Sequence, residues 1–251
     1  MSGHNRWSKI KRQKAAMGAT KGKLFSKIIK EITVATRMGG ADPDGNFRLR
    51  ASMNAAREAN MSRDQIDRAI KKGTGELEGA AYEEVVYEGY GPHGVALIVE
   101  CLTDNRNRTA SDVRSTFARG GGNLGATGSV SFGFAHQGTI QVKPGPTEEQ
   151  VLEAVLEAEA LDVVPLADDE GGGFEVRTDP HGLHAAMVAL EKAGFTLGES
   201  KLGYAPTNTV KLEGEAAHKV LKLIEALEDH DDVQAVHANL EVDEATLAGM
   251  A

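Results

Sequence analysis

The sequence predicts an α+β protein of several domains, in which a helical domain comes first and a ferredoxin-like βαββαβ domain is inserted into a discontinuous α+β domain. Three observations support this fold class. The chain has 251 residues, enough to bury more than one core. Its apolar residues recur at helical spacing near the N-terminus and at strand spacing after residue 81. Between residues 139 and 204, predicted strands and helices follow the order βαββαβ.

Three helices are predicted in the N-terminal domain, residues 1–78. The first carries an apolar face over residues 24–35, with lysines largely on the other face. The second is predicted from about residue 46 to residue 60. The third begins at Ser62 as N-cap, where Gln65 completes a capping box. Gly73 follows two lysines and is predicted as the C-cap of this third helix.

The discontinuous α+β domain is predicted at residues 79–135 and 206–251. Its first part contains two strands at 84–88 and 95–102, a helix with a capping-box-like start at Thr109 and Asp112, and a strand at 129–134. Its second part contains a strand, a helix and a strand at 209–212, 215–228 and 233–242. Because the second part is too small to fold alone, we expect it to join the sheet of the first part.

The inserted domain is predicted at residues 136–205. Its strands are predicted at 139–142, 161–166, 174–177 and 196–204, and its helices at 148–160 and 183–192. An acidic glycine turn at 168–173 joins the two middle strands. This order predicts a complete ferredoxin-like unit.

Charge is distributed unevenly along the chain. The formal net charge is −9, yet the first 30 residues contain nine Lys or Arg and no Asp or Glu. Residues 1–72 carry 17 basic and 6 acidic residues, which leaves 11 basic and 31 acidic residues for the rest. A cationic end raises the local concentration of phosphates, while an acidic remainder repels nucleic acid. The sequence therefore predicts a nucleic-acid partner for the N-terminal domain.

The candidate nucleic-acid contacts combine basic residues with two stacking groups, His4 and Trp7. Trp7 could equally pack the N-terminal arm onto the helical core. The cationic candidates are Arg6, Lys9, Lys11, Arg12, Lys14, Lys21, Lys23, Lys27, Lys30, Arg106 and Arg108. The last two precede a predicted helix, where its dipole disfavours positive charge. Either an internal carboxylate, such as Glu100, Asp104 or Asp112, or an external phosphate would compensate.

Other chemistries find little support in the sequence. Two stretches match G-x-G-x-x-G, but neither lies between a strand and a following helix, so we interpret both as turns. The single cysteine, Cys101, lies in an apolar run and is expected to be buried. Asp229 to Asp232 and Asp168 to Glu170 are interpreted as solvated acidic turns, and no complete set of metal ligands or catalytic residues is apparent. We expect a cytoplasmic protein without cofactor, metal or membrane span.

Several motifs carry a resemblance to a known family. They are Gly3-His4 with Trp7, Lys21-Gly22-Lys23, Glu88-Gly89-Tyr90-Gly91-Pro92, the stretch 101–109 with its Leu-Thr-Asp-Asn-Arg-Asn-Arg-Thr loop, and Gly121-Gly122-Asn123-Leu124-Gly125. With these motifs the chain resembles the YebC/PmpR family, which includes the mitochondrial translational activator of cytochrome c oxidase, through almost its whole length.

The resemblance implies a non-enzymatic, cytoplasmic three-domain protein with one α+β domain inserted in another. Members have been described as transcriptional regulators that bind promoter DNA, and related members as translation factors that contact ribosomal RNA and relieve stalling at proline runs. Both roles require docking on a phosphate backbone, and the sequence leaves DNA and RNA open as targets. We expect a monomer with no small-molecule substrate.

Two rival functions remain open at this point. A metal-dependent nucleic-acid hydrolase would need clustered carboxylates near the basic face, for which Glu31, Asp42 and Asp44 are the candidates. An acidic protein-interaction scaffold would use the α+β domains and would need the basic arm only for solubility.

Overall fold

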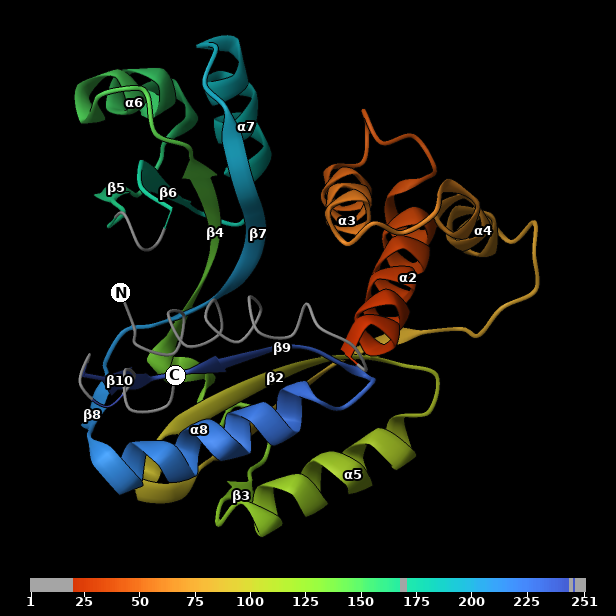
Figure 1. Ribbon diagram of the computed structural model, residues 1–251, viewed down its shortest axis with the longest axis vertical. Helices are drawn as coiled ribbons and strands as arrows, with labels where there is room; N and C mark the ends of the chain where they lie inside the picture. Colours follow the sequence, from red (N-terminus) through yellow and green to blue (C-terminus); the bar gives the residue numbers. More distant parts are fainter. Residues whose placement is uncertain (1–19, 168–170, 244–245, 247–251) are drawn as a thin grey trace. The chain divides into compact units, whose positions relative to one another are not determined.

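The computed structural model describes residues 20–167, 171–243 and 246 (Figure 1). The chain divides into two compact units. The first comprises Met1–Phe134 with Pro206–Ala251, and the second comprises Ala135–Ala205. The expectation of a mixed α/β protein whose N-terminal helices precede its sheets is confirmed.

The first unit begins with three helices, α2 (Thr20–Gly39), α3 (Phe47–Glu58) and α4 (Arg63–Thr74). Both α3 and α4 pack on α2 (Figure 1). Their apolar faces meet in a core that includes Ile28, Ile32, Leu49, Ile66 and Ala69. The helical spacing of apolar residues therefore predicted the buried face of α2 correctly from Phe25 onward, whereas Leu24 is 47% exposed.

The two ends of α4 differ in how well the sequence predicted them. At the start of α4 the Gln65 side chain accepts the Ser62 N–H at 3.2 Å, as the capping box predicted. Gly73, however, is not the C-cap. The helix continues to Thr74 and ends at Gly75, whose φ of +85° suits glycine.

Gly73 has a packing role instead. It lies buried within α4, where an added Cβ would be 2.5 Å from the Thr36 Cβ and 2.7 Å from the Thr33 carbonyl oxygen on α2. Glycine at this position lets the two helices approach closely. This explains why a glycine next to two lysines lies inside the helix rather than at its end.

The first unit also contains a four-stranded sheet in the order β3-β1-β2-β9. The strands are β1 (Glu83–Tyr90), β2 (Ala96–Thr103), β3 (Asn123–Leu124) and β9 (Val233–Ala238). Helices α5 (Arg106–Arg119) and α8 (Gly214–Glu228) pack against one face (Figure 1). Leu97, Val99, Phe117, Leu221 and Ile224 form the core between sheet and helices.

Three sequence-based predictions for the strands and helices of this α+β part are wrong. Helix α5 begins at Arg106 with Asn105 as N-cap, so Thr109 lies inside the helix rather than at its start. The Asn105 side chain accepts the Arg108 N–H at 3.1 Å, and this N-cap explains why the helix starts before the predicted Thr109. Residues 131–133 form a 3-10 turn instead of a strand, and the next strand begins only at Phe134.

The third difference concerns the predicted strand 233–242, which is two strands. Strand β10 (Leu240–Val242) leaves the large sheet and pairs in parallel with β8 (Val210–Leu212). Asn239 makes the change: its side chain accepts the Ala96 N–H at 2.8 Å, while its carbonyl oxygen accepts the Val210 N–H at 2.7 Å. The chain thus passes at this residue from the four-stranded sheet to the two-stranded sheet of β8 and β10.

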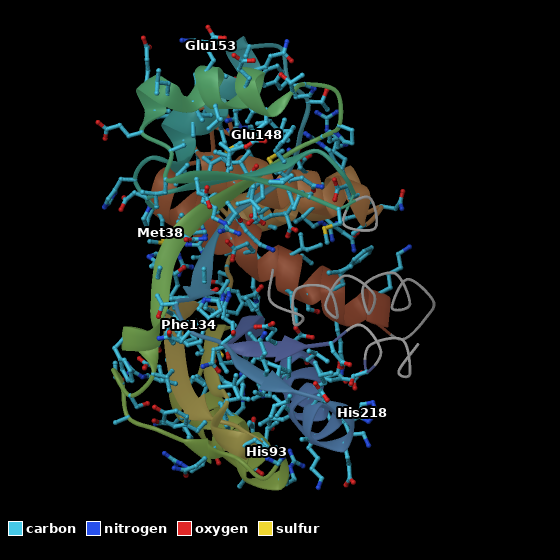
Figure 2. The ribbon with its side chains drawn as sticks, turned by 90° about the vertical axis from the view of Figure 1, so that its left-hand side faces the viewer. Met38, His93, Phe134, Glu148, Glu153 and His218 are labelled. Atoms are coloured by element: carbon cyan, nitrogen blue, oxygen red, sulfur yellow. The ribbon has the colours of Figure 1, made fainter. Side chains whose placement is uncertain are left out.

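The second unit is built on a sheet in the order β5-β6-β4-β7. Its elements are β4 (Phe134–Val142), α6 (Glu148–Val155), β5 (Asp162–Pro165), β6 (Phe174–Thr178), α7 (Leu183–Lys192) and β7 (Leu197–Pro206). Helix α7 has the predicted bounds. Glu148 and Glu153 project from α6, and Phe134 marks the start of β4 (Figure 2).

Candidate nucleic-acid interface

Seven of the predicted contact residues lie outside the described residues: His4, Arg6, Trp7, Lys9, Lys11, Arg12 and Lys14. The other six fall on two helices. Lys21, Lys23, Lys27 and Lys30 belong to α2, and Arg106 and Arg108 belong to the first turn of α5.

Three lysines of α2 contact the turn that follows α8. Lys23 Nζ donates to the Asp229 carbonyl oxygen at 3.1 Å, and Lys27 Nζ donates to that of Glu228. Lys30 Nζ donates to the Asp231 carbonyl oxygen at 3.0 Å. Carbonyl groups at a helix C-terminus lack intrahelical partners and carry the negative end of the dipole, so ammonium groups stabilise them. These lysines therefore anchor α2 to the end of α8.

Asp232 is the centre of this anchor. Its side chain is buried, with the residue only 3% exposed. It forms an ion pair with Lys30, accepts from the Thr109 hydroxyl at 2.7 Å and lies 3.3 Å from an Arg108 nitrogen. Burial alone would raise the pKa of Asp232, but the hydrogen bonds from Lys30 and Thr109 and the charge of Lys30 outweigh it and lower this pKa to about 2. The carboxylate is ionised at neutral pH.

The acidic turn at 229–232 was therefore interpreted wrongly at one position, because Asp232 is not solvated. The same carboxylate is one of two internal partners of Arg108. Arg108 Nη2 lies 2.8 Å from Asp104, one of the three carboxylates expected from the sequence, and 3.3 Å from Asp232, which was not among them. Asp232 was missed because it is distant from Arg108 in sequence and lies in a run of charged residues.

Arg106 and Lys21 have a different environment from the anchoring residues. Both side chains are exposed. No ion pair joins Arg106 to another residue in the described part of the chain, and Lys21 Nζ lies 5.6 Å from the centre of the Phe25 ring. Their charges are available to an external anion.

Helix α4 carries a further group of exposed cations that were not among the predicted contacts. They are Arg63, Arg68, Lys71 and Lys72, and within residues 20–167 and 171–243 none of them forms an ion pair. The charged last turn of the predicted helix was the signal that could have identified Lys71 and Lys72. Like Lys21, they are exposed positive charges in the helical part of the first unit.

Two of the carboxylates named for the hydrolase, Glu31 and Asp42, have partners within the first unit. Glu31 forms an ion pair with Arg48, which also pairs with Glu84 on β1. Asp42 accepts the Asp44 N–H at 3.0 Å within the loop after α2. Across the described residues, no group of three or more His, Cys, Asp or Glu side chains is arranged to hold a metal ion.

Glu88 is a buried carboxylate whose role the sequence did not reveal. It accepts backbone N–H groups of Gly128, Val130 and Ser131 at 2.8, 2.8 and 2.9 Å. Burial would raise the pKa of Glu88, but these three hydrogen bonds outweigh it and lower the pKa. Glu88 thus fixes the loop that leads out of the sheet toward β4.

The glycine-rich stretches around Glu88 are explained by close backbone packing. A Cβ at Gly89 would lie 2.6 Å from the Asn123 carbonyl oxygen, and one at Gly122 would lie 2.5 Å from that of Tyr90. The two stretches therefore pack on each other. Cys101 is buried as expected, and burial, aided by the charge of Asp232, raises the pKa of its thiol to about 12.

These features define a class of protein: a multidomain α/β protein whose cationic N-terminal helices precede acidic sheet domains. The comparisons give the family. Residues 5–76 match the model of the TACO1/YebC protein N-terminal domain, and residues 82–240 match that of the TACO1/YebC second and third domain. The chain belongs to the TACO1/YebC family, the YebC/PmpR family of the sequence resemblance.

Relatives match over nearly the full length. A protein of Myxococcus xanthus, named "Probable transcriptional regulatory protein", is 60% identical over 98% of both chains. A protein of Persephonella marina with the same name is 53% identical over 96% of both chains. A crystal structure of a conserved hypothetical protein from Aquifex aeolicus, 48% identical, matches with a TM-score of 0.78 and covers 90% of this chain and 92% of that one.

None of the helices in the described ranges is long and apolar enough to cross a bilayer.

Proposed function

We propose that this protein is a non-enzymatic regulator of gene expression that binds nucleic acid through its N-terminal domain. The segregation of charge carries the proposal: 17 basic and 6 acidic residues lie in residues 1–72, against 11 and 31 in the rest. The exposed cations of α4 and the names of the relatives as transcriptional regulatory proteins support it.

The proposed interface divides the predicted contacts into two groups. Arg6, Lys9, Lys11, Arg12, Lys14, Lys21 and Arg106 neutralise phosphates, and His4 and Trp7 stack on a base or ribose. Lys23, Lys27, Lys30 and Arg108 have internal partners. The second group therefore orients the basic helices through these partners.

Recognition through the phosphate backbone fits either of two targets, promoter DNA or ribosomal RNA. Mixed Lys and Arg with few polar side chains to read bases favour recognition of backbone and shape. The family resemblance adds a specific role for the second target, a ribosome-associated translation factor that relieves stalling at proline runs. Crosslinking in cells followed by mapping separates these targets, because ribosomal sites, messenger sites and promoter sites indicate different mechanisms.

We also propose three domains: a helical domain at residues 1–78, a discontinuous α+β domain at 79–135 with 206–251, and an inserted domain at 136–205. The division into two units near residues 134 and 206 supports it. The sheet order β5-β6-β4-β7, with the element order βαββαβ, supports a ferredoxin-like insert. We place the protein in the cytoplasm as a monomer.

A charge-neutralised variant tests the proposed function. Changing Lys9, Lys11, Arg12 and Lys14 to Gln removes four proposed phosphate contacts and should weaken binding of a labelled 20-nucleotide RNA or duplex DNA about 100-fold near 0.15 M salt. The control changes Lys143, Lys192, Lys201 and Lys211, all exposed and in the acidic half, to Gln.

Equal affinities of the variant and the control would contradict the proposal and favour the protein-interaction scaffold. Cleavage of the labelled RNA in magnesium would favour the hydrolase.

A further inference from the structure

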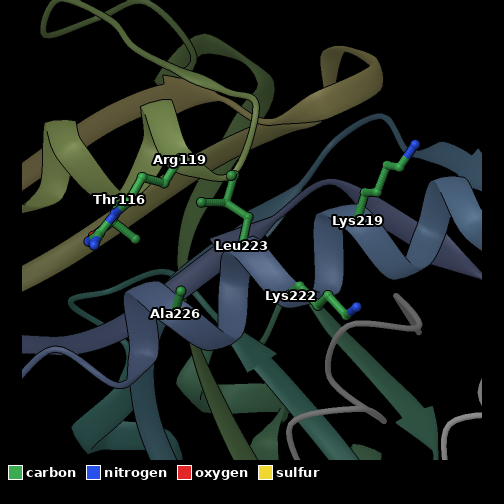
Figure 3. A pocket seen from close by; sticks show the side chains of 7 residues that line it. Thr116, Arg119, Lys219, Lys222, Leu223 and Ala226 are labelled. Atoms are coloured by element: carbon green, nitrogen blue, oxygen red, sulfur yellow. The ribbon is translucent and has the colours of Figure 1, made fainter.

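A groove of about 440 Å³ lies between the end of α5 and the outer face of α8, far along the chain from the basic N-terminus. It is lined by Thr116, Arg119, Gly120, Lys219, Lys222, Leu223 and Ala226. Figure 3 shows Leu223 between Arg119 on one side and Lys219 and Lys222 on the other. The groove therefore has cations on both sides of Leu223.

The charge of the lining contrasts with the acidic part of the chain that contains it. After residue 72 the chain has only 11 basic residues against 31 acidic ones. Three of these basic residues line this one groove, and no carboxylate does. Such a local reversal of charge attracts anions that the surrounding surface repels.

The three cations are not neutralised within the groove. Lys222 is exposed and forms no ion pair in the described part of the chain, and Arg119 donates to the Thr116 hydroxyl at 3.4 Å. Lys219 pairs with Glu215 one turn away on α8 at 3.1 Å, but both side chains are exposed. Exposed pairs of this kind contribute little free energy, so Lys219 can exchange its partner for a phosphate.

One of the lining residues is a glycine at the end of α5. Leu223 is buried beneath the end of α5, and a Cβ at Gly120 would lie 2.7 Å from one of its methyl carbons. Gly120 therefore lets the end of α5 lie directly on Leu223 of α8. Cations on both sides of a groove that no carboxylate lines match the repeated phosphates of a nucleic-acid strand.

We infer that this groove is a second binding site for the phosphodiester backbone of a nucleic acid, and the inference rests on the proposed function. Arg119 contacts a phosphate on one side of the groove, and Lys219 and Lys222 contact phosphates on the other. A strand bound by the basic N-terminal helices would gain affinity from this second contact.

The salt dependence of binding tests the inference on the full chain. In the Arg119→Gln/Lys222→Gln variant the log-log slope of affinity for the labelled RNA against salt should become shallower by about 1.4, since each lost contact removes about 0.7 for a single strand. The matched control, Lys143→Gln/Lys192→Gln, also removes two charges from the acidic half and should keep the wild-type slope. The charge-preserving Arg119→Lys/Lys222→Arg variant should keep it as well.

The outcomes separate the groove from the proposed function. If the wild type binds and both glutamine variants keep its slope, the groove inference is overturned and the proposed function stands. If the wild type binds neither RNA nor duplex DNA, both fail. If Arg119→Gln/Lys222→Gln weakens binding of labelled polyglutamate but not of RNA, the groove belongs to an acidic protein segment and the inference is overturned.

Discussion

The anchor centred on Asp232 makes a prediction about stability and pH. Asp232→Asn keeps the size of the side chain and an oxygen that can accept from Thr109, but removes the charge that faces Lys30 and Arg108. We expect the first unit to become less stable at neutral pH, because the variant leaves the ammonium group of Lys30 without its counter-ion.

The size of the effect follows from the pKa of Asp232. This pKa is about 2 in the folded protein against an ordinary value of 3.8. One pKa unit corresponds to about 1.4 kcal/mol, so the ionised carboxylate contributes about 2 kcal/mol to the free energy of unfolding. Because the folded pKa is depressed, this contribution is complete above pH 4 and is lost as pH falls through 2.

Native-state hydrogen exchange of peptides from α8 and β9 measures this effect locally. The stability difference between wild type and Asp232→Asn should be about 2 kcal/mol at pH 6 and should shrink steadily below pH 4. The control is Asp231→Asn, an exposed neighbour whose side chain forms no ion pair with a described residue. A difference that is absent at pH 6, or that does not change between pH 5 and pH 2.5, would refute the reasoning.

Two further predictions concern packing and loop structure. Gly73→Ala places a Cβ against Thr36 and the Thr33 carbonyl and should destabilise the helical domain by about 1–3 kcal/mol in urea unfolding monitored by circular dichroism. Gly22→Ala, where a Cβ meets nothing within 4 Å, should be neutral or slightly stabilising, and equal effects would contradict the packing argument. Glu88→Gln weakens three backbone hydrogen bonds and should speed amide exchange at Gly128, Val130 and Ser131, with a cost of about 1–3 kcal/mol. Unchanged exchange at these amides would show that the Glu88 charge does not hold the loop.

Local signals in the sequence predicted most of the regular elements. The apolar spacing of α2, the capping box at Ser62 and the bounds of α7 all depend on residues within a few positions of each other. Such features require no knowledge of the rest of the chain, which is why the sequence was sufficient.

Three of the errors occur where a contact between residues distant in the sequence determines the structure. Gly73 resembles a C-cap until the close approach of Thr36 is known, and Asn239 divides a predicted strand because it bonds Ala96 and Val210. Asp232 resembles a solvated acid until Lys30 and Thr109 are brought to it. In each case a tertiary contact overrides the local pattern.

In the candidate interface, too, some features could be predicted from the sequence and others depend on tertiary contacts. Counting charges identified the basic end, since composition does not depend on folding. Which lysines are free depends on the fold: the amphipathic pattern places Lys23, Lys27 and Lys30 on the polar face of α2, and that face contacts the end of α8. The groove at Leu223 likewise required the structure.

The affinity of the intact protein for nucleic acid as a function of salt concentration tests the central claim most directly. If the seven proposed cations each neutralise one phosphate, the logarithm of the association constant should fall with the logarithm of salt at a slope between about −5 and −6. A slope shallower than about −2 would mean that few phosphates are neutralised, and it would contradict the account.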